Sequence, residues 1–131
     1  MKLSINSTKK IKKFYLKDLN DKIHFIELDK NQKLPKGWYE LNIFYVDEII
    51  KIKDISINGA SLREFIYTGF TVDSTGNRHS PGSSLWEEGT CFKLWIHTEV
   101  GIMFQRFCEA IHNYDFGTNL FEKYVFTIDK P

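Results

Sequence analysis

Apolar and polar residues alternate along the first half of the chain with the period of two expected for half-buried β-strands. These stretches are rich in β-branched and aromatic residues and are separated by turn-forming residues such as Asn58-Gly59. The pattern predicts strands at 22–28, 38–46 and 49–57. We expect these strands to pair antiparallel, because short turns join the segments.

Further along, the apolar period changes from that of a strand to that of a helix. A predicted central strand at 91–98 is followed by apolar residues at i, i+3, i+4, i+7, i+8 and i+11. This spacing predicts an amphipathic helix at about 99–113, capped by Thr98, with Arg106 on the polar side and the apolar arc buried on a sheet. The arc consists of Val100, Met103, Phe104, Phe107, Cys108 and Ile111. A last strand is predicted at 121–128.

A second, shorter helix is predicted at about 62–68. Ser61 and Glu64 have the spacing of a capping box, in which both side chains bind exposed N–H groups of the first helical turn. Gly69 is expected to end this helix.

Together these elements predict an α+β fold. A curved antiparallel β-sheet would pack against one main amphipathic helix, with the short helix beside it. The chain has 131 residues, of which 42% are hydrophobic, which suits one core. We therefore expect a single globular domain spanning 1–131.

The net charge of +1 conceals an uneven distribution. Residues 1–17 contain six lysines and no acidic residue, so the remainder carries −5. We interpret this lysine-rich segment as an edge that its charges keep soluble. Contact with nucleic acid is the weaker interpretation, because the chain has only three arginines and no motif that binds phosphate or reads bases.

The apolar segments and the cysteine content both favour a protein of a reducing compartment. The sequence has no apolar segment long enough for a signal peptide or a membrane span, so we expect a cytoplasmic protein without membrane contact. Cys91 and Cys108 are then expected to be reduced, buried thiols rather than a disulfide.

Histidines and cysteines are the first candidates for chemistry. His24 and His97 lie in strand patterns and have no motif partner, so we expect them to be hydrogen-bonded structural groups. Cys108 and His112 lie one helical turn apart and could share a metal with Cys91 and His97, but the spacing matches no zinc signature. We predict no metal site and no cofactor.

An enzyme would have to be assembled from scattered residues. Ser80, Ser83 and Ser84 follow His79, but no nucleophile-elbow motif is present. Two pairs of adjacent acids, at 47–48 and 87–88, are explained by solvation. We therefore predict no catalytic residues, and a small hydrolase or metal-dependent enzyme is the alternative.

The long polar segment at 73–90 is the predicted binding site. It holds two glycine turns, and its length exceeds that of an ordinary connection. Trp86 would be an apolar anchor for a partner, Glu87 and Glu88 would steer a basic partner, and Arg78 and His79 would form the rim. In the opposite interpretation Trp86 folds back over the core.

By elimination, the sequence predicts a small intracellular protein-binding domain. The most concrete class is an immunity or antitoxin protein, which neutralises a toxin such as a basic nuclease by covering its active site. The other alternative is a phage or mobile-element accessory protein that binds a nucleotide or nucleic acid.

Overall fold

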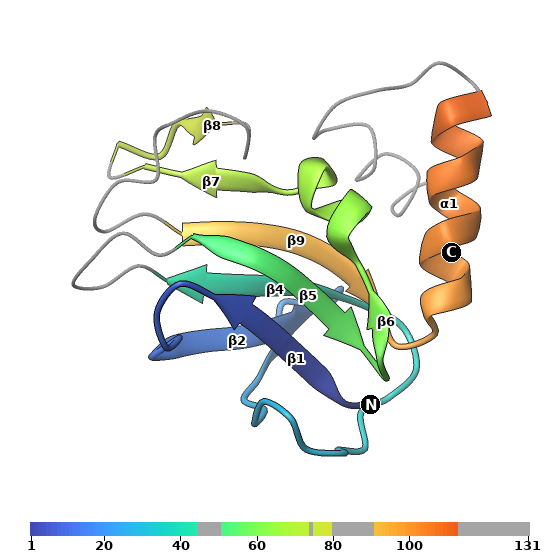
Figure 1. Cartoon of the computed structure of the whole chain (residues 1–131), viewed down its shortest axis with the longest axis horizontal. Helices are drawn as coiled ribbons and strands as arrows, with labels where there is room; N and C mark the ends of the chain where they lie inside the picture. Colours follow the sequence, from blue (N-terminus) through green and yellow to red (C-terminus); the bar gives the residue numbers. More distant parts are fainter. Residues whose placement is uncertain (45–50, 74, 80–90, 113–131) are drawn as a thin grey trace.

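The structure is a computed structural model that describes residues 1–44, 51–73, 75–79 and 91–112 (Figure 1). The strands are β1 (Leu3–Ser7), β2 (Lys13–Asp18), β3 (Ile23–His24), β4 (Trp38–Phe44), β5 (Ile52–Ile57), β6 (Ala60–Ser61), β7 (Phe70–Val72), β8 (Arg78–His79) and β9 (Cys91–His97). The helices are the 3-10 helix η1 (Arg63–Thr68) and the α-helix α1 (Val100–His112).

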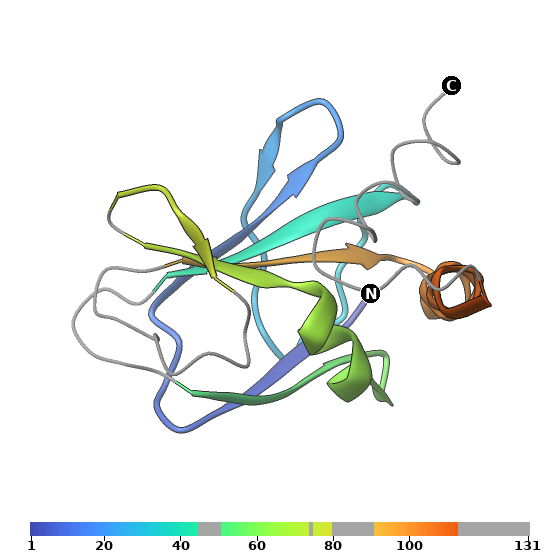
Figure 2. The same cartoon turned by 90° about the horizontal axis from the view of Figure 1, so that it is seen from above.

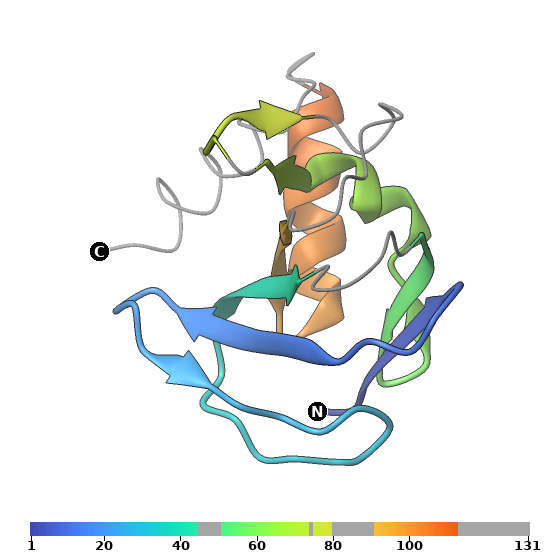
Figure 3. The same ribbon diagram turned by 90° about the vertical axis from the view of Figure 1, so that its left-hand side faces the viewer.

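The described strands form two antiparallel sheets. One has the order β1-β5-β6 and the other has the order β3-β2-β4-β9-β7-β8. In Figure 3, β1 and β5 lie on one side and β2 and β3 on the other, and Figures 1 and 2 show α1 standing beside the strands. The predicted α+β class is confirmed. The strands form two sheets rather than one. Among the described residues, β1, β5 and β6 pair with one another and not with the strands of the larger sheet.

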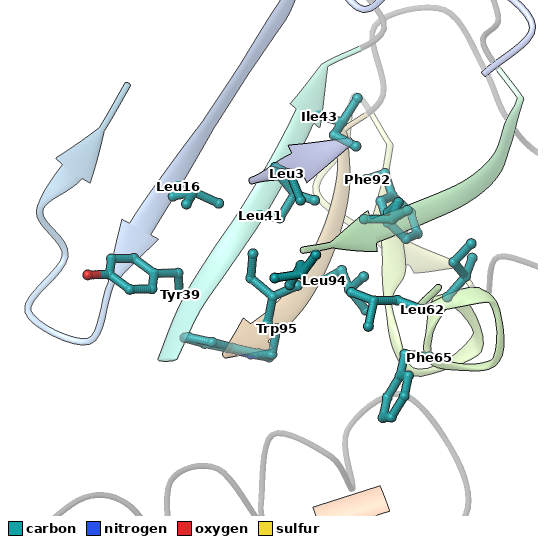
Figure 4. Close-up of a cluster of buried hydrophobic side chains, with 14 of the residues drawn as sticks. Leu3, Leu16, Tyr39, Leu41, Ile43, Leu62, Phe65, Phe92, Leu94 and Trp95 are labelled. Atoms are coloured by element: carbon teal, nitrogen blue, oxygen red, sulfur yellow. The ribbon is translucent and has the colours of Figure 1, made fainter. Parts of the chain in front are cut away.

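The core lies between the inner faces of the two sheets. Leu16, Leu41 and Leu94 are direct neighbours across β2, β4 and β9, and each is at most 1% exposed. Leu3 and Ile57, which are paired across β1 and β5, are equally buried. Figure 4 shows side chains from both sheets meeting in this cluster. Successive strand residues point to opposite faces, so Ile55 and Ile57 of β5 form one buried face. In contrast, β4 and β9 have buried residues on both faces.

The strand predictions differ most at 22–28. The prediction at 91–98 is confirmed as β9, which lies between β4 and β7 inside its sheet. At 22–28 only Ile23–His24 is a strand, because the chain then leaves the sheet and the N–H of Asp29 donates to the carbonyl of Leu3 at 2.8 Å. Residues 45–46, 49–50 and 121–128 of the other predictions lie outside the described residues.

The predicted capping box at the short helix is wrong. The helix η1 begins one residue later, with Leu62 at its N-cap and no side-chain capping bond. The Ser61 hydroxyl accepts the N–H of Arg63 at 3.2 Å and donates to Asp54 at 2.8 Å. The strand β5 therefore holds the serine that the sequence pattern assigned to the helix.

The range of the main helix is confirmed, but its buried face differs from the prediction. Met103 is fully buried, whereas Phe104 is 43% exposed and Cys108 is exposed. The Arg106 side chain, predicted to face outward, is only 12% exposed. The helix is thus turned about its axis, so that the predicted apolar arc is only partly buried.

The residue predicted to cap α1 has a different contact. The hydroxyl of Thr98 accepts the N–H of Gly37 at 3.1 Å, and thereby ties the start of the helix to the start of β4.

The first part of the predicted 73–90 loop is a hairpin. Strands β7 and β8 pair through Val72 with Arg78, and the Asp73 carboxylate accepts the N–H groups of Thr75 and Asn77 at 2.9 Å. This short polar turn explains why the segment looked like a loop in the sequence. Residues 74 and 80–90 lie outside the described residues.

Candidate functional site

Of the predicted partner-binding residues, two lie in the part of the chain that the structure describes. Arg78 and His79 form β8, the last strand in its sheet. Trp86, Glu87 and Glu88 lie outside the described residues, as do the serines at 80, 83 and 84. The surface predicted on these residues therefore stays a prediction, and the described residues offer two other exposed surfaces.

The first surface is the outward stripe of α1. Gly101, Phe104, Gln105 and Cys108 are all exposed and follow helical spacing. Because residues are about 100° apart around a helix, this stripe overlaps one half of the predicted apolar arc. The opposite side contains Met103, Ile102, which packs against the core, and the partly buried Arg106.

A groove lies between this stripe and η1. The ring of Phe104 meets the buried ring of Phe65 edge-on, with centroids 4.9 Å apart. The groove has a volume of about 330 Å³ and is lined by Ser61, Arg63, Phe65 and Phe104. Its apolar floor can take an apolar side chain, while Arg63 at the rim can pair with a carboxylate.

The second surface is a row of aromatic rings formed by Phe44 of β4, Tyr15 of β2 and Phe25, which directly follows β3. The ring centroids of Tyr15 and Phe44 are 5.4 Å apart, and those of Tyr15 and Phe25 are 6.3 Å apart. Phe25 is 81% exposed and Ile23 is 44% exposed. The Lys13 ammonium lies over the Phe44 ring, 4.8 Å from its centroid. This surface is not visible in the sequence, because its members come from three separate segments.

An imidazole and a carboxylate meet at the β2–β3 hairpin. His24 Nε2 and Asp18 Oδ2 are 2.9 Å apart, and Asp18 Oδ1 accepts the N–H groups of Asn20 and Lys22. The hydrogen bond from His24 is the main reason that the pKa of Asp18 is lowered. The sequence does not reveal Asp18 as the partner of His24, because six residues and a turn separate the two.

This pair fits a structural role better than a catalytic one. A hollow of about 220 Å³ lies beside Asp18, and among the described residues its lining includes no serine, threonine or cysteine that a base could activate. The Tyr39 hydroxyl in that lining donates to the carbonyl of Pro35 at 2.6 Å, and burial raises the pKa of Tyr39. We interpret the pair as a hydrogen bond that stabilises the β2–β3 hairpin, which is the structural role expected for His24.

A buried polar network connects β4 and β9. The Asn42 carbonyl oxygen accepts from Lys93 Nζ at 2.7 Å, and the Asn42 amide donates to Glu40 at 3.1 Å. Cys91 Sγ is 3.7 Å from the same Asn42 oxygen. Burial raises the pKa of the Cys91 thiol to about 11, so the thiol is a poor nucleophile despite its polar neighbours.

This difference between the cysteines can be measured by alkylation. Iodoacetamide near pH 8 should modify Cys108 quickly, because Cys108 is exposed, and Cys91 slowly, because Cys91 is buried and its burial raises the pKa of the thiol. Peptide mapping by mass spectrometry at successive times will separate the two sites. Cys108→Ser should remove the fast phase, and equal rates at both cysteines would contradict the buried position of Cys91.

The ligands considered for a shared metal do not converge. His97 Nδ1 accepts the N–H of Glu99 at 2.9 Å, at the opposite end of β9 from Cys91. Six residues of strand separate the two by about 20 Å. The expectation that Cys108 is buried is wrong, since the rotation of α1 exposes it. Among the described residues no three potential ligands lie close enough to hold a metal.

Comparison with known proteins gave no match among family models, curated proteins or solved structures. In the part of the chain that the structure describes, no helix is long and apolar enough to cross a membrane.

Proposed function

We propose that this chain is a protein-binding domain that acts through the outward stripe of α1 and the groove beside it. The observation that supports this proposal is the orientation of the helix, with Phe104 and Cys108 outside and Arg106 turned inward. A helix that serves only the core buries its apolar arc. A helix that leaves part of its apolar arc exposed is expected where that part forms a binding surface.

The groove has the composition of an interface anchor. Phe104 stands on the rigid ring of Phe65, so little conformational freedom is lost when a partner covers it. Arg63 is exposed at the same groove, and arginine is enriched among the residues that dominate binding energy. A partner would insert an apolar side chain over Phe65 and place a carboxylate near Arg63.

Within this function we propose the immunity or antitoxin class, in which the domain neutralises a toxin by covering its active site. The absence of a catalytic constellation in the sequence favours this class over an enzyme. The predicted surface at Trp86, Glu87 and Glu88 would supply a second contact to the same partner.

The test begins with the protein that co-purifies at native expression. With that partner reconstituted, Phe104→Ala should weaken binding by about 2 kcal/mol, mainly by faster dissociation, because a desolvated aromatic anchor holds the complex after encounter. Phe25→Ala, which removes another exposed aromatic residue, is the matched control. Surface plasmon resonance measures both rate constants.

The location of the binding site and the immunity class can be tested separately. Equal affinities for the wild type and Phe104→Ala would show that the α1 stripe is not the site, and loss of affinity in Trp86→Ala would then move the site to the predicted loop. If the partner has no toxicity that this chain suppresses in co-expression, the immunity class is wrong.

A further inference from the structure

Exposed lysines from two distant segments gather at one end of the β1–β5 ladder. The N–H of Thr8 donates to the Lys51 carbonyl at 2.9 Å, and the N–H of Lys51 donates to the Thr8 hydroxyl at 3.0 Å. The turn after β1 and the start of β5 therefore lie side by side, as Figure 1 also shows. The exposed lysines of these segments are Lys9, Lys10, Lys12, Lys13, Lys51 and Lys53.

The local charge at this end is strongly positive. The six lysines contribute six positive charges, and Asp47 and Glu48, which lie outside the described residues, are the acids that follow β4 in sequence. With both of these acids and Asp54, which follows Lys53 in β5, counted fully, the two segments keep a formal charge of +3. Such a potential attracts polyanions.

The aromatic row begins at this same end. Lys13 and Phe44 are register partners across β2 and β4, and Lys13 lies over the Phe44 ring. Tyr15 is the next outward residue of β2, and Phe25 lies beyond it. A path along the outer face therefore runs from the lysine end to the exposed ring of Phe25.

We propose that this face binds single-stranded nucleic acid, with phosphates at the lysine end and a base stacked on Phe25. Proteins that bind single strands without sequence preference combine a positively charged path with aromatic side chains that stack bases. Phe25 is the main stacking residue, because Lys13 occupies the face of Phe44, whereas Phe25 meets Tyr15 only by an edge-on contact.

The lysine content fits this ligand. The guanidinium of arginine forms paired hydrogen bonds with guanine or with a phosphate. The ammonium of lysine is a point charge, and its contacts with phosphate neutralise the backbone without distinguishing between bases. The small number of arginines therefore favours binding to the phosphate backbone over base-specific recognition. We expect little preference among sequences. This inference is independent of the proposed protein partner, which would use the α1 stripe.

The test is fluorescence anisotropy with fluorescein-labelled oligo(dT) of about 20 nucleotides, at salt concentrations from about 50 to 200 mM. Phe25→Ala should weaken binding by about 5- to 100-fold through loss of stacking. A triple variant, K10Q/K51Q/K53Q, should weaken binding and reduce the slope of log affinity against log salt by about 2.

Two matched controls show whether the effects are specific to this face. K30Q/K33Q/K36Q removes three exposed lysines of another loop, and Phe104→Ala removes an exposed aromatic residue of α1; both should bind oligo(dT) like the wild type. Equal weakening by the control lysines, or unchanged affinity in Phe25→Ala, would overturn the proposal. Polyglutamate that binds as tightly as oligo(dT) would also overturn it and assign the face to an acidic protein.

Discussion

Phe65→Ala should lower the free energy of unfolding by about 3 to 5 kcal/mol. Phe65 is 1% exposed, and its ring contacts Phe104 at 4.9 Å and Phe107 at 5.0 Å between centroids. Truncation removes apolar area from the core and leaves a cavity that η1 and α1, joined through these rings, can only partly close. Urea unfolding followed by circular dichroism measures the change.

Phe104→Ala is the matched control for this prediction. Its ring packs on Phe65 from the outside and is 43% exposed, so its loss should cost about 1 kcal/mol or less. The apolar period alone would assign both α1 phenylalanines, Phe104 and Phe107, to the core. A larger loss in Phe104→Ala than in Phe65→Ala would show that α1 presents its other face to the sheets.

Local patterns predicted much of the fold. The strands β4, β5 and β9 and the helix α1 are visible in the sequence, because β-branched and aromatic residues gather in the strands and apolar residues recur with a helical period in α1. The 3-10 helix was predicted at the right place with the wrong cap, because the Ser61 hydroxyl binds Asp54 on a neighbouring strand. A single sequence does not show that contact.

The candidate sites depend on information that local patterns lack. The predicted apolar arc of α1 spans about 140° of the helix, and contacts with other elements decide which part of it is buried. Lys51 meets the lysines after β1 only because β1 pairs with β5, about 45 residues away by sequence position. Asp18 and His24 meet across a hairpin. Each site therefore follows from a long-range pairing or from a helix rotation.

Gly69 is the point where η1 passes into β7, and its role also depends on a distant strand. The prediction that Gly69 ends the short helix is confirmed, because Gly69 is the C-cap of η1. Its φ is −81° and its ψ is −179°, an extended conformation that any residue adopts, so the backbone does not require glycine here. Glycine is required there by space, since an added Cβ would lie 2.6 Å from the Lys93 carbonyl oxygen and 2.8 Å from Phe92 Cζ.

Gly69→Ala should therefore destabilise the protein by about 1 to 3 kcal/mol, whereas Gly101→Ala should stabilise it by up to about 1 kcal/mol. In both variants the lost glycine freedom of the unfolded chain favours folding by about 0.4 to 1 kcal/mol. At Gly69 that gain is smaller than the cost of overpacking against β9, because the Lys93 carbonyl is backbone and cannot rotate away. At Gly101 in α1 nothing lies within 4 Å of the added Cβ, and alanine is the better helix former. Urea unfolding of both variants tests the opposite signs, and a stabilised Gly69→Ala would show that η1 and β7 do not approach β9 this closely.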